Sequence, residues 1–370
     1  MHKICNDKQK PFKLTEIVSI TSLSLNESIQ RQSRRLHVIS LGMIDSWYLE
    51  HLACPTHGTG LDVSVSAESP TLRCANGCRF PVVQGIPVIL PNEAFAPTHE
   101  NAIASLREAS DPKSAGISDN RTPSADEIDG WVQEMVAHTN SLLYTHLVGR
   151  LQRYPIPEIP LTPGRPGDTL LDIGCGWGRW SLAAARKGFF PIGIDTSLRA
   201  ALAATRVAKQ LDLPSRFVVA DSRYLPFRPQ TFDAAYSYSV LQHFSKEDVI
   251  ASLSSLKPLM RLGGVSKLHL LNTLGLRSML VQLRRRFREA RAFETRYWLL
   301  GEMLETFSHR LGPSRVEIDG FFVQGRIEDR ALFRPIHQLI FDGSRALIWL
   351  SRYFPSLSHF ADNLFVITDY

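Results

Sequence analysis

The sequence predicts an α/β protein with a mostly parallel sheet of seven strands and flanking helices. Apolar runs that end in acidic residues alternate with helical segments from Thr169 to about Lys267. This alternation is typical of parallel strands, because each crossover between them needs a helix to return the chain. Two further apolar runs, at 316–323 and 363–369, supply the last strands, with a helix near 336–352 between them.

The first strand begins at Thr169 and leads directly into a glycine loop. The loop reads Asp172-Ile-Gly174-Cys175-Gly176-Trp-Gly178, and a helix of small residues follows from Ser181. Glycine permits positive φ angles and lets a ligand lie against bare backbone at the N-terminus of a helix. The loop therefore predicts a site for a nucleotide-type cofactor.

Two details of this loop disfavour a dinucleotide. A dinucleotide fingerprint places its third glycine one residue later, where this chain has Arg179. A pyrophosphate beside the loop would also be repelled by Asp172, whereas a cofactor with an ammonium and a sulfonium would be attracted to it. The sequence thus favours a cofactor that carries positive charge at this end.

Two later strands also end in acids. Asp195 follows the run that begins at Phe190 and lies about 20 residues after Gly174, the distance at which a βαβ unit presents a carboxylate to ribose hydroxyls. Asp221 ends the run that begins at Arg216, and its carboxylate is suited to accept a hydrogen bond from an adenine amino group. A fourth strand begins at 232 and leads to the segment around 243.

Together these residues resemble the class I S-adenosylmethionine (SAM)-dependent methyltransferases, which have a Rossmann-like fold, over roughly Asp126 to Tyr370. The resemblance implies that Asp172 and the glycine loop lie at the methionine end of SAM, that Asp195 binds the ribose, and that Asp221 with Ser222 meets the adenine. The candidate cofactor-binding residues are Asp172, Gly174, Cys175, Gly176, Gly178, Asp195, Thr196, Asp221, Ser222 and Tyr238.

Two pairs of possible metal ligands precede this region. They are Cys54 with His57, and Cys74 with Cys78. Zn²⁺ takes four thiolate or imidazole ligands, and residues so spaced can wrap it in a tight turn, which Gly77 would ease. Together with the phrases Leu52-Ala-Cys-Pro and Arg79–Pro91, the pairs resemble the zinc-ribbon family of tRNA-methyltransferase activator proteins.

The match to the zinc-ribbon family has two departures. His57 stands where cysteine is usual, and the second pair encloses three residues rather than two. The resemblance implies a closed structural zinc site with no open position for catalysis. The alternative is a metal-free domain held by its small core.

The chain divides into four parts. Residues 1–42 lack a sustained period and are expected to form a flexible extension, and residues 43–91 to form a small α+β domain of zinc-ribbon type. Residues 92–125, rich in Ala, Ser, Asn, Asp and Pro, are expected to be a linker. Residues 126–370 would form the methyltransferase-like domain, with a first helix over about 126–153 and a helical insertion at 273–312.

The composition excludes a uniformly basic nucleic-acid binder. The formal charge is +6 over 370 residues, but the positive charge is concentrated within residues 1–40 and 277–296. No apolar run approaches the ~20 residues that span a bilayer, so no membrane partner is expected. Five cysteines, three of them clustered with a histidine, indicate metal chemistry in a reducing cytoplasm rather than disulfides.

The acceptor side of the site is less sharply defined. Methyl transfer from a sulfonium is an in-line displacement that needs orientation above all, and a base only if the nucleophile carries a proton. The candidate catalytic residues are His243, as a base or a loop-fixing side chain, and Tyr238, as a wall of the pocket. Asn140 and Tyr144, four residues apart on the first helix, are candidates for a lid, the alternative being a solvated polar stripe.

The basic segment bears on the choice of substrate. Arg284, Arg288 and Arg291 are expected to share one helical face, which would bind an anionic substrate or RNA phosphate, or would simply be solvated. The sequence favours methylation of a small-molecule acceptor, anionic if this face binds it, in a specialised pathway. The alternative is an RNA base methyltransferase, since ribosomal-RNA guanine methyltransferases can also carry an N-terminal zinc module. A binding module with an inactive fold is disfavoured by the intact loop and its three strand-end acids.

Overall fold

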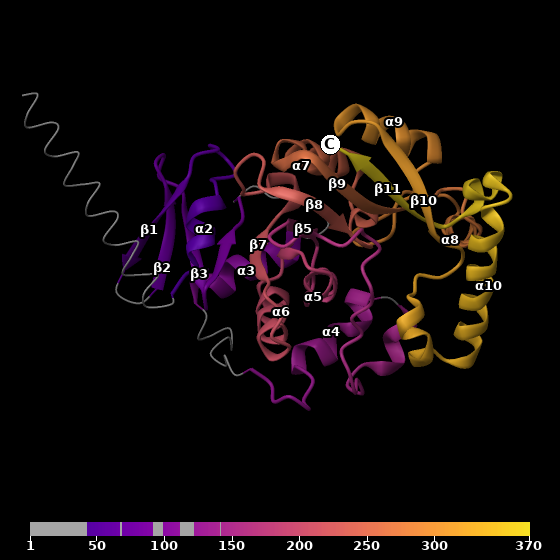
Figure 1. The fold of residues 1–370 in the computed structure, drawn as a ribbon, viewed down its shortest axis with the longest axis horizontal. Coiled ribbons are helices and arrows are strands. Elements are labelled where there is room, and N and C mark those ends of the chain that lie inside the picture. The colour runs from indigo at the N-terminus through magenta and orange to yellow at the C-terminus, as the bar shows by residue number, and fades with distance from the viewer. Residues whose placement is uncertain (1–42, 67–68, 92–98, 112–121, 141) are drawn as a thin grey trace, which may run out of the picture.

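A single mixed sheet of eleven strands runs through the part of the chain that the structure describes (Figure 1). The computed structural model describes residues 43–370 apart from 67–68, 92–98, 112–121 and 141, so the expected extension at 1–42 lies outside it. In chain order the strands are β1 (Leu61–Ser66), β2 (Ser69–Cys74), β3 (Arg79–Val83), β4 (Ile86–Ile89), β5 (Thr169–Ile173), β6 (Phe190–Asp195), β7 (Arg216–Ala220), β8 (Phe232–Ser237), β9 (Met260–Leu271), β10 (Ser314–Gly320) and β11 (Asn363–Asp369). Their order across the sheet is β1-β2-β3-β4-β7-β6-β5-β8-β9-β11-β10.

Helices cover both faces of this sheet and enclose a core on each. They are α2 (Ser46–His51), α3 (His99–Ser110), α4 (Gly130–Asn140), α5 (Arg179–Arg186), α6 (Leu198–Gln210), α7 (Lys246–Leu256), α8 (Leu276–Arg284), α9 (Leu300–Arg310) and α10 (Pro335–Ser351). In Figure 1, α5 and α6 lie on one side of the sheet, and α7 and α9 on the other. Apolar side chains of α5 and α6 belong to one buried cluster, and those of α7 and α9 to another.

The seven strands from β5 onward form the unit that the sequence predicts. Strands β7, β6, β5, β8 and β9 are parallel neighbours, and β11 runs antiparallel between β9 and β10. Every residue of β5 is buried, which explains why it reads as a continuous apolar run rather than an alternating one.

The expectation that the sheet has seven strands is nevertheless wrong for the whole molecule, because the N-terminal strands extend it to eleven. Strand β4 pairs in parallel with β7, with Val88 opposite Val219 and Ile89 opposite Ala220. This pairing covers the backbone N–H and C=O groups that an exposed β7 edge would leave open. The described residues of the segment 43–91 therefore continue the sheet instead of standing apart from it.

Further contacts hold the N-terminal segment against the sheet. The Tyr48 hydroxyl donates to the carbonyl of Phe217 (2.9 Å) and accepts from the Phe217 N–H (3.1 Å). The Ala53 N–H donates to the Pro226 carbonyl (2.9 Å), and apolar side chains of the segment share a buried cluster with those of β5 and β6. The domain boundary expected at residue 91 remains a prediction, because packed side chains continue from one side of it to the other.

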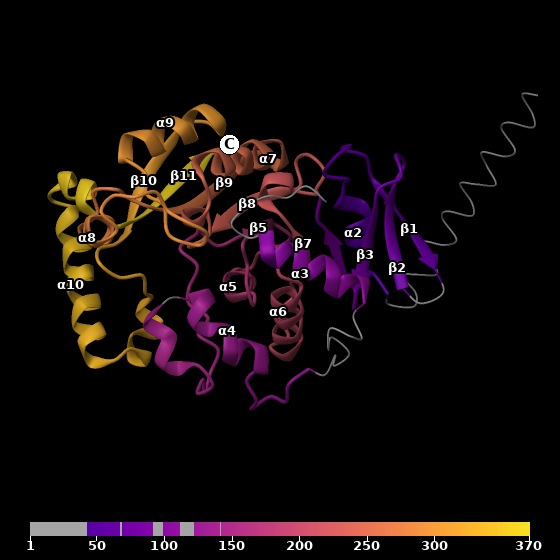
Figure 2. The ribbon, with the colours of Figure 1, turned by 180° about the vertical axis from the view of Figure 1, so that it is seen from behind.

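Two helical expectations need correction. The expected linker contains α3, which packs beside α6 (Figure 2), and its Ser105 hydroxyl donates to the Thr196 carbonyl (2.7 Å). The expected helix over 126–153 is shorter, because α4 ends at Asn140 and the described residues resume in a 3₁₀ helix, η1 (Leu142–Leu147).

The insertion at 273–312 contains α8 and α9 joined by an irregular segment. Helix α8 ends at Arg284, and Arg286, Phe287 and Ala292 then adopt positive φ angles (53°, 57° and 44°). Non-glycine residues in this region cannot continue a right-handed helix. Arg284, Arg288 and Arg291 therefore do not share a helical face, and that expectation is wrong. Helix α10 lies close to its predicted position.

Candidate functional site

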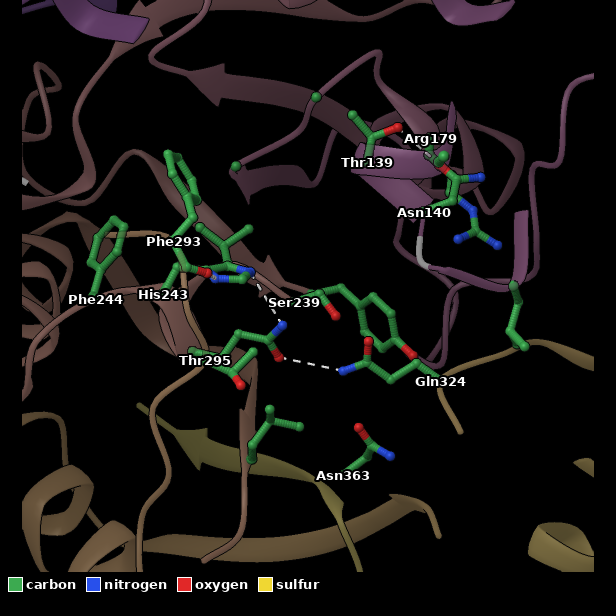
Figure 3. A pocket seen from close by; sticks show the side chains of 18 of the residues that line it. Thr139, Asn140, Arg179, Ser239, His243, Phe244, Phe293, Thr295, Gln324 and Asn363 are labelled. Carbon is green, nitrogen blue, oxygen red and sulfur yellow. Dashed lines mark hydrogen bonds between the residues drawn. The ribbon is translucent and has the colours of Figure 1, made fainter. Parts of the chain in front are cut away.

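A cavity of about 1570 Å³ lies at the carboxyl ends of β5, β6 and β8. Strand β5 is flanked by β6 on one side and β8 on the other, so the chain reverses its direction of progress across the sheet at this point. Ligands of open α/β sheets bind in the crevice at such a switch point. Residues of α3, α4, α8 and α10 complete the lining, and Figure 3 shows His243 and Phe293 on one side of the cavity and Thr139 and Asn140 on the other.

The glycine loop approaches its neighbours more closely than a side chain would allow. Gly174, Gly176 and Gly178 have φ angles of 73°, 52° and 85°. A Cβ at Gly174 would lie 2.3 Å from Cγ2 of Val240, on the loop that leaves β8. A Cβ at Gly178 would lie 3.0 Å from the Cβ of Ala204 on α6. Gly174 and Gly176 line the cavity, whereas Gly178 lets the start of α5 pack on α6.

The N–H groups at the start of the loop are already used within the protein. Gly174 and Cys175 both donate to the Ile194 carbonyl (2.8 and 2.9 Å), and Gly176 donates to Oδ2 of Asp195 (3.0 Å). A phosphate cradle works by aiming free N–H groups at the anion. These three N–H groups are therefore not free to bind a pyrophosphate, in agreement with the interpretation of the sequence.

Asp195 ties the end of β6 to this loop and lines the cavity. Besides the bond from Gly176, its Oδ1 accepts from the Ser197 N–H (2.9 Å). Burial raises its pKa, which the N–H donors of Ser197 and Gly176 oppose. Each carboxylate oxygen has two lone pairs, so each can accept one further bond from a ligand hydroxyl. Thr196 and Cys175 line the same part of the cavity.

Asp172 and Asp221 are held away from the cavity lining. Asp172 is buried, its Oδ2 accepts from the Ser181 hydroxyl (2.7 Å), and burial raises its pKa to about 7. Both oxygens of Asp221 accept from the guanidinium of Arg223, at 2.8 and 3.1 Å. The roles expected for these two acids toward SAM remain predictions, whereas Ser222 does line the cavity.

His243 is held in one tautomer on the acceptor side of the cavity. Its Nδ1 lies 2.7 Å from the Phe293 carbonyl, which can only accept, so Nδ1 carries the proton. Its Nε2 then accepts from the amide of Gln242 (3.3 Å), whose Oε1 accepts from Gln324 (3.3 Å) (Figure 3). Burial lowers the pKa of His243. The imidazole is thus neutral at pH 7, with a lone pair on Nε2.

Tyr238 forms part of the cavity wall and is fixed as a neutral phenol. Its hydroxyl donates to Oδ2 of Asp319 (3.0 Å), and burial raises its pKa. The guanidinium of Arg326 lies 4.8 Å from the centre of its ring. Because its hydroxyl is already engaged with a carboxylate, Tyr238 is suited to shape the cavity rather than to accept a proton.

The two lid candidates do not share a helical face. Asn140 ends α4 and lines the cavity, and its Oδ1 accepts from Nε1 of Trp177 (3.0 Å). Tyr144 lies in η1, and its hydroxyl donates to Oδ2 of Asp329 (2.5 Å) and accepts from Arg179 (3.0 Å). The pair expectation is wrong, because the helix that would align the two residues ends between them.

Several lining residues have no signature in the sequence. They are Asn101, Thr139, Ser239, Gln242, Arg285 and Gln324. Ser239 stands out in the structure because its φ is 62°, a conformation that costs of order 1–3 kcal/mol and clusters at functional sites. The buried hydroxyl of Ser239 and the Nδ2 of Asn140 have no hydrogen-bond partner among the described residues. Both residues line the cavity.

A second cluster of reactive side chains lies in the N-terminal segment, outside the cavity lining. The ligand atoms of Cys54, His57, Cys74 and Cys78 all lie within 4.8 Å of one another, and each sulfur is 3.5–3.6 Å from the His57 Nδ1. Ligands about 2.0–2.3 Å from a tetrahedral Zn²⁺ lie about 3.3–3.8 Å apart, so these residues fit the ion. Gly58 and Gly77 close the two turns with φ angles of 66° and 93°.

Comparison with known proteins agrees with the site at the glycine loop. Residues 170–264 match the family model described as a methyltransferase domain. The chain is 33% identical over 100 residues to a "Probable fatty acid methyltransferase" of Mycobacterium tuberculosis, covering 27% of this chain and 23% of that protein. It is 29% identical over 162 residues to the 2-methyl-6-phytyl-1,4-hydroquinone methyltransferase of a Synechocystis species, covering 42% and 44%.

These matches are partial. The chain spans less than half the length of either curated relative. Among solved structures, a SAM-dependent methyltransferase from Methanosarcina mazei is 18% identical with a TM-score of 0.40, covering 59% of this chain and 98% of that one. The matched family segment contains the glycine loop, Asp195 and the residues around His243. Residues 170–264 are therefore similar to methyltransferase domains.

Proposed function

We propose that this chain is a SAM-dependent methyltransferase that methylates a small-molecule acceptor in the cavity. The observation that carries the proposal is the arrangement of Asp195 and the glycine loop at the switch point of the sheet, inside the segment that matches the methyltransferase family. Both curated relatives are named for small-molecule substrates, a fatty acid and a phytyl hydroquinone.

Different residues of the cavity would contact the different parts of the cofactor. Asp195 would accept from the ribose hydroxyls, and the backbone at Gly174 and Gly176 would face the methionine end. We place the adenine beside Ala220 and Ser222, which line the cavity, rather than on Asp221, whose oxygens hold Arg223. Asn140 and Ser239 offer the unpartnered polar atoms described above. When bound, SAM supplies the methyl group on a sulfonium that already carries its leaving group.

His243 gives the acceptor side a group that can take a proton. Its Nε2 lone pair is available once an acceptor hydroxyl replaces the long contact from Gln242. The bond from Nδ1 to the Phe293 carbonyl holds the ring in place and would stabilise the imidazolium that forms. The apolar lining near Leu271, Leu276 and Val281 would keep water from the acceptor.

The alternative of RNA methylation loses one of the two observations that motivated it, because the three arginines do not form a single face. Arg288 is instead paired with Glu294 through two bonds of 2.6 Å. An acceptor from a specialised pathway stays within the proposal, since the insertion at 273–312 gives this cavity walls of its own. We place the protein in the cytoplasm, where its thiols would remain reduced.

We further propose that Cys54, His57, Cys74 and Cys78 hold a structural Zn²⁺. Three thiolates and one imidazole fill the four positions that the ion takes, so no position would remain open for catalysis. The ion would fasten the turn after α2 to the β2–β3 turn. Its role would be to stabilise the N-terminal strands that complete the sheet.

The assignment of the cofactor is tested by calorimetry with SAM and S-adenosylhomocysteine. Asp195→Asn removes the charge that accepts from the ribose, at a cost of about 1.5–3 kcal/mol, or roughly 10- to 150-fold in affinity. Asp212→Asn is the matched control, because Asp212 is exposed and asparagine tolerates its φ of 51°. Unchanged affinity in Asp195→Asn, with a normal unfolding temperature, would contradict the proposal.

A further inference from the structure

Helices α8 and α10 expose a broad apolar surface, which we call the α8–α10 face. Its members are Leu276, Met279, Leu280, Leu283, Phe287 and Phe293 around α8, and Ile336, Leu339, Ile340, Trp349 and Tyr353 on and after α10. Figures 1 and 2 place the two helices beside each other at the end of the molecule that carries β10. Most of the large exposed apolar side chains among the described residues belong to this end.

Helix α8 exposes its apolar residues to solvent and buries a polar one. Leu276, Met279, Leu280 and Leu283 recur at three- and four-residue steps, which places them on one face, and that face is exposed. The residue that α8 buries is Ser278, whose N–H and hydroxyl both donate to Oδ1 of Asp362 (2.7 and 3.0 Å). A polar contact thus anchors the helix, while its apolar stripe faces outward.

Helix α10 also exposes large apolar side chains, although it packs on the core through Phe341. It buries Phe341 and Ser344, and the Ser344 hydroxyl accepts from the Phe321 N–H (2.9 Å). On its other side Ile336, Leu339 and Trp349 are 59%, 68% and 56% exposed. Two neighbouring helices therefore present apolar side chains in the same region, more than scattered surface residues would explain.

Positive charge surrounds the apolar stripe of α8. Arg277, Arg284, Arg286 and Arg291 are exposed, and none of them forms an ion pair with another described residue. The acids of residues 277–296 are Glu289 and Glu294, and the second is held by Arg288. An apolar stripe beside unpaired arginines is the pattern of helices that lie in the surface of an anionic bilayer.

The cavity reaches this surface. Leu276, Leu280, Phe293 and Ile340 are exposed members of the α8–α10 face and also line the cavity. The same cavity extends to His243 and to the glycine loop. An apolar path thus joins the surface to the acceptor side of the site.

We propose that the α8–α10 face docks this protein on an anionic lipid bilayer, from which the cavity takes an acceptor that carries a hydrocarbon chain. The inference of docking depends only on the α8–α10 face, whereas the choice of acceptor rests on the proposed function. None of the described helices is long and apolar enough to cross a membrane. The proposal replaces the sequence-based expectation of no membrane partner with attachment at the bilayer surface.

Docking is tested by co-sedimentation of the full chain, without SAM, with phosphatidylcholine vesicles that do or do not contain 30% phosphatidylglycerol. We expect binding to the anionic vesicles at least tenfold tighter than to the neutral ones, and a loss of at least tenfold in Leu283→Glu/Leu339→Glu. Neither leucine lines the cavity, so SAM affinity should not change. Leu262→Glu is the matched control, because Leu262 is 94% exposed on β9 and is not a member of this face.

The charge contribution is measured in Arg284→Gln/Arg286→Gln/Arg291→Gln, which should lose the preference for phosphatidylglycerol. Absence of vesicle binding by the native chain would overturn the proposal, as would an equal loss in Leu262→Glu. Light scattering completes the test: a native dimer that Leu283→Glu/Leu339→Glu converts to monomers would show that a second copy covers the face, and would also overturn it. Because docking is measured without SAM, its failure is distinct from failure of the methyltransferase proposal.

Discussion

Replacing Gly174 by alanine should damage the site through two separable effects. The new Cβ would lie 2.3 Å from Cγ2 and 2.8 Å from Cγ1 of Val240, a clash that a close-packed interior relieves only by moving the loop. Overpacking of this kind costs about 1–3 kcal/mol. The φ of 73° adds about 1–2 kcal/mol for any residue with a side chain. The free energy of unfolding should therefore fall by about 2–5 kcal/mol.

Gly263→Ala separates the two effects, because Gly263 has a φ of 82° and no atom within 4 Å of a Cβ built on it. This control should show the backbone cost alone. Gly174→Ala/Val240→Ala should recover most of the clash, since only the Cβ of Val240 would remain, at 3.0 Å. Urea unfolding followed by tryptophan fluorescence measures all three variants, and calorimetry their SAM affinity. A Gly174→Ala variant no less stable than Gly263→Ala would refute the reasoning.

Three further outcomes follow from the described contacts. Because burial lowers the pKa of His243, the neutral base should persist below pH 6.5, so kcat/KM should stay flat to that pH, and His243→Gln should lower kcat by about 10²–10⁴-fold if the acceptor loses a proton. Because the pKa of Asp172 is raised to about 7, the contribution of this group to stability should be fully present below pH 4 and should decline by a few kcal/mol as the pH rises to 7. Asp172→Asn should remove this contribution in urea titrations at several pH values. Chelation, or Cys74→Ser, should lower the unfolding temperature, and elemental analysis of the native protein should find one zinc per chain; its absence would contradict the metal assignment.

Local chemistry made the parallel part of the fold predictable. The run Thr169–Ile173 lacks the alternation of a half-buried strand because β5 is buried on both faces, and the glycines that follow allow close approaches to Val240 and Ala204. The glycines and their spacing are visible in the sequence itself, although the residues that require them are distant in the chain. The position of Asp195 next to the loop is likewise a consequence of one crossover of fixed length.

Features that depend on distant contacts were not predictable in this way. Arg223 follows Asp221 by two residues, yet only the folded turn shows that it occupies both carboxylate oxygens. Tyr144 leaves the cavity for Asp329, which lies 185 residues later in the chain. The pairing of β4 with β7 joins segments that no periodicity connects, so the sheet proved wider than the sequence indicates.

The same pairing changes what the N-terminal segment can do. If residues 43–91 formed a separate zinc-ribbon domain, as the sequence predicts, loss of the metal would leave SAM binding intact. In the structure Ile89 pairs with Ala220, and Ala220 lines the cavity where we place the adenine. Apolar side chains of the N-terminal strands also belong to the same buried cluster as those of β5 and β6. Loss of the metal should therefore weaken SAM binding as well as stability, because it loosens the strand that supports one wall of the site.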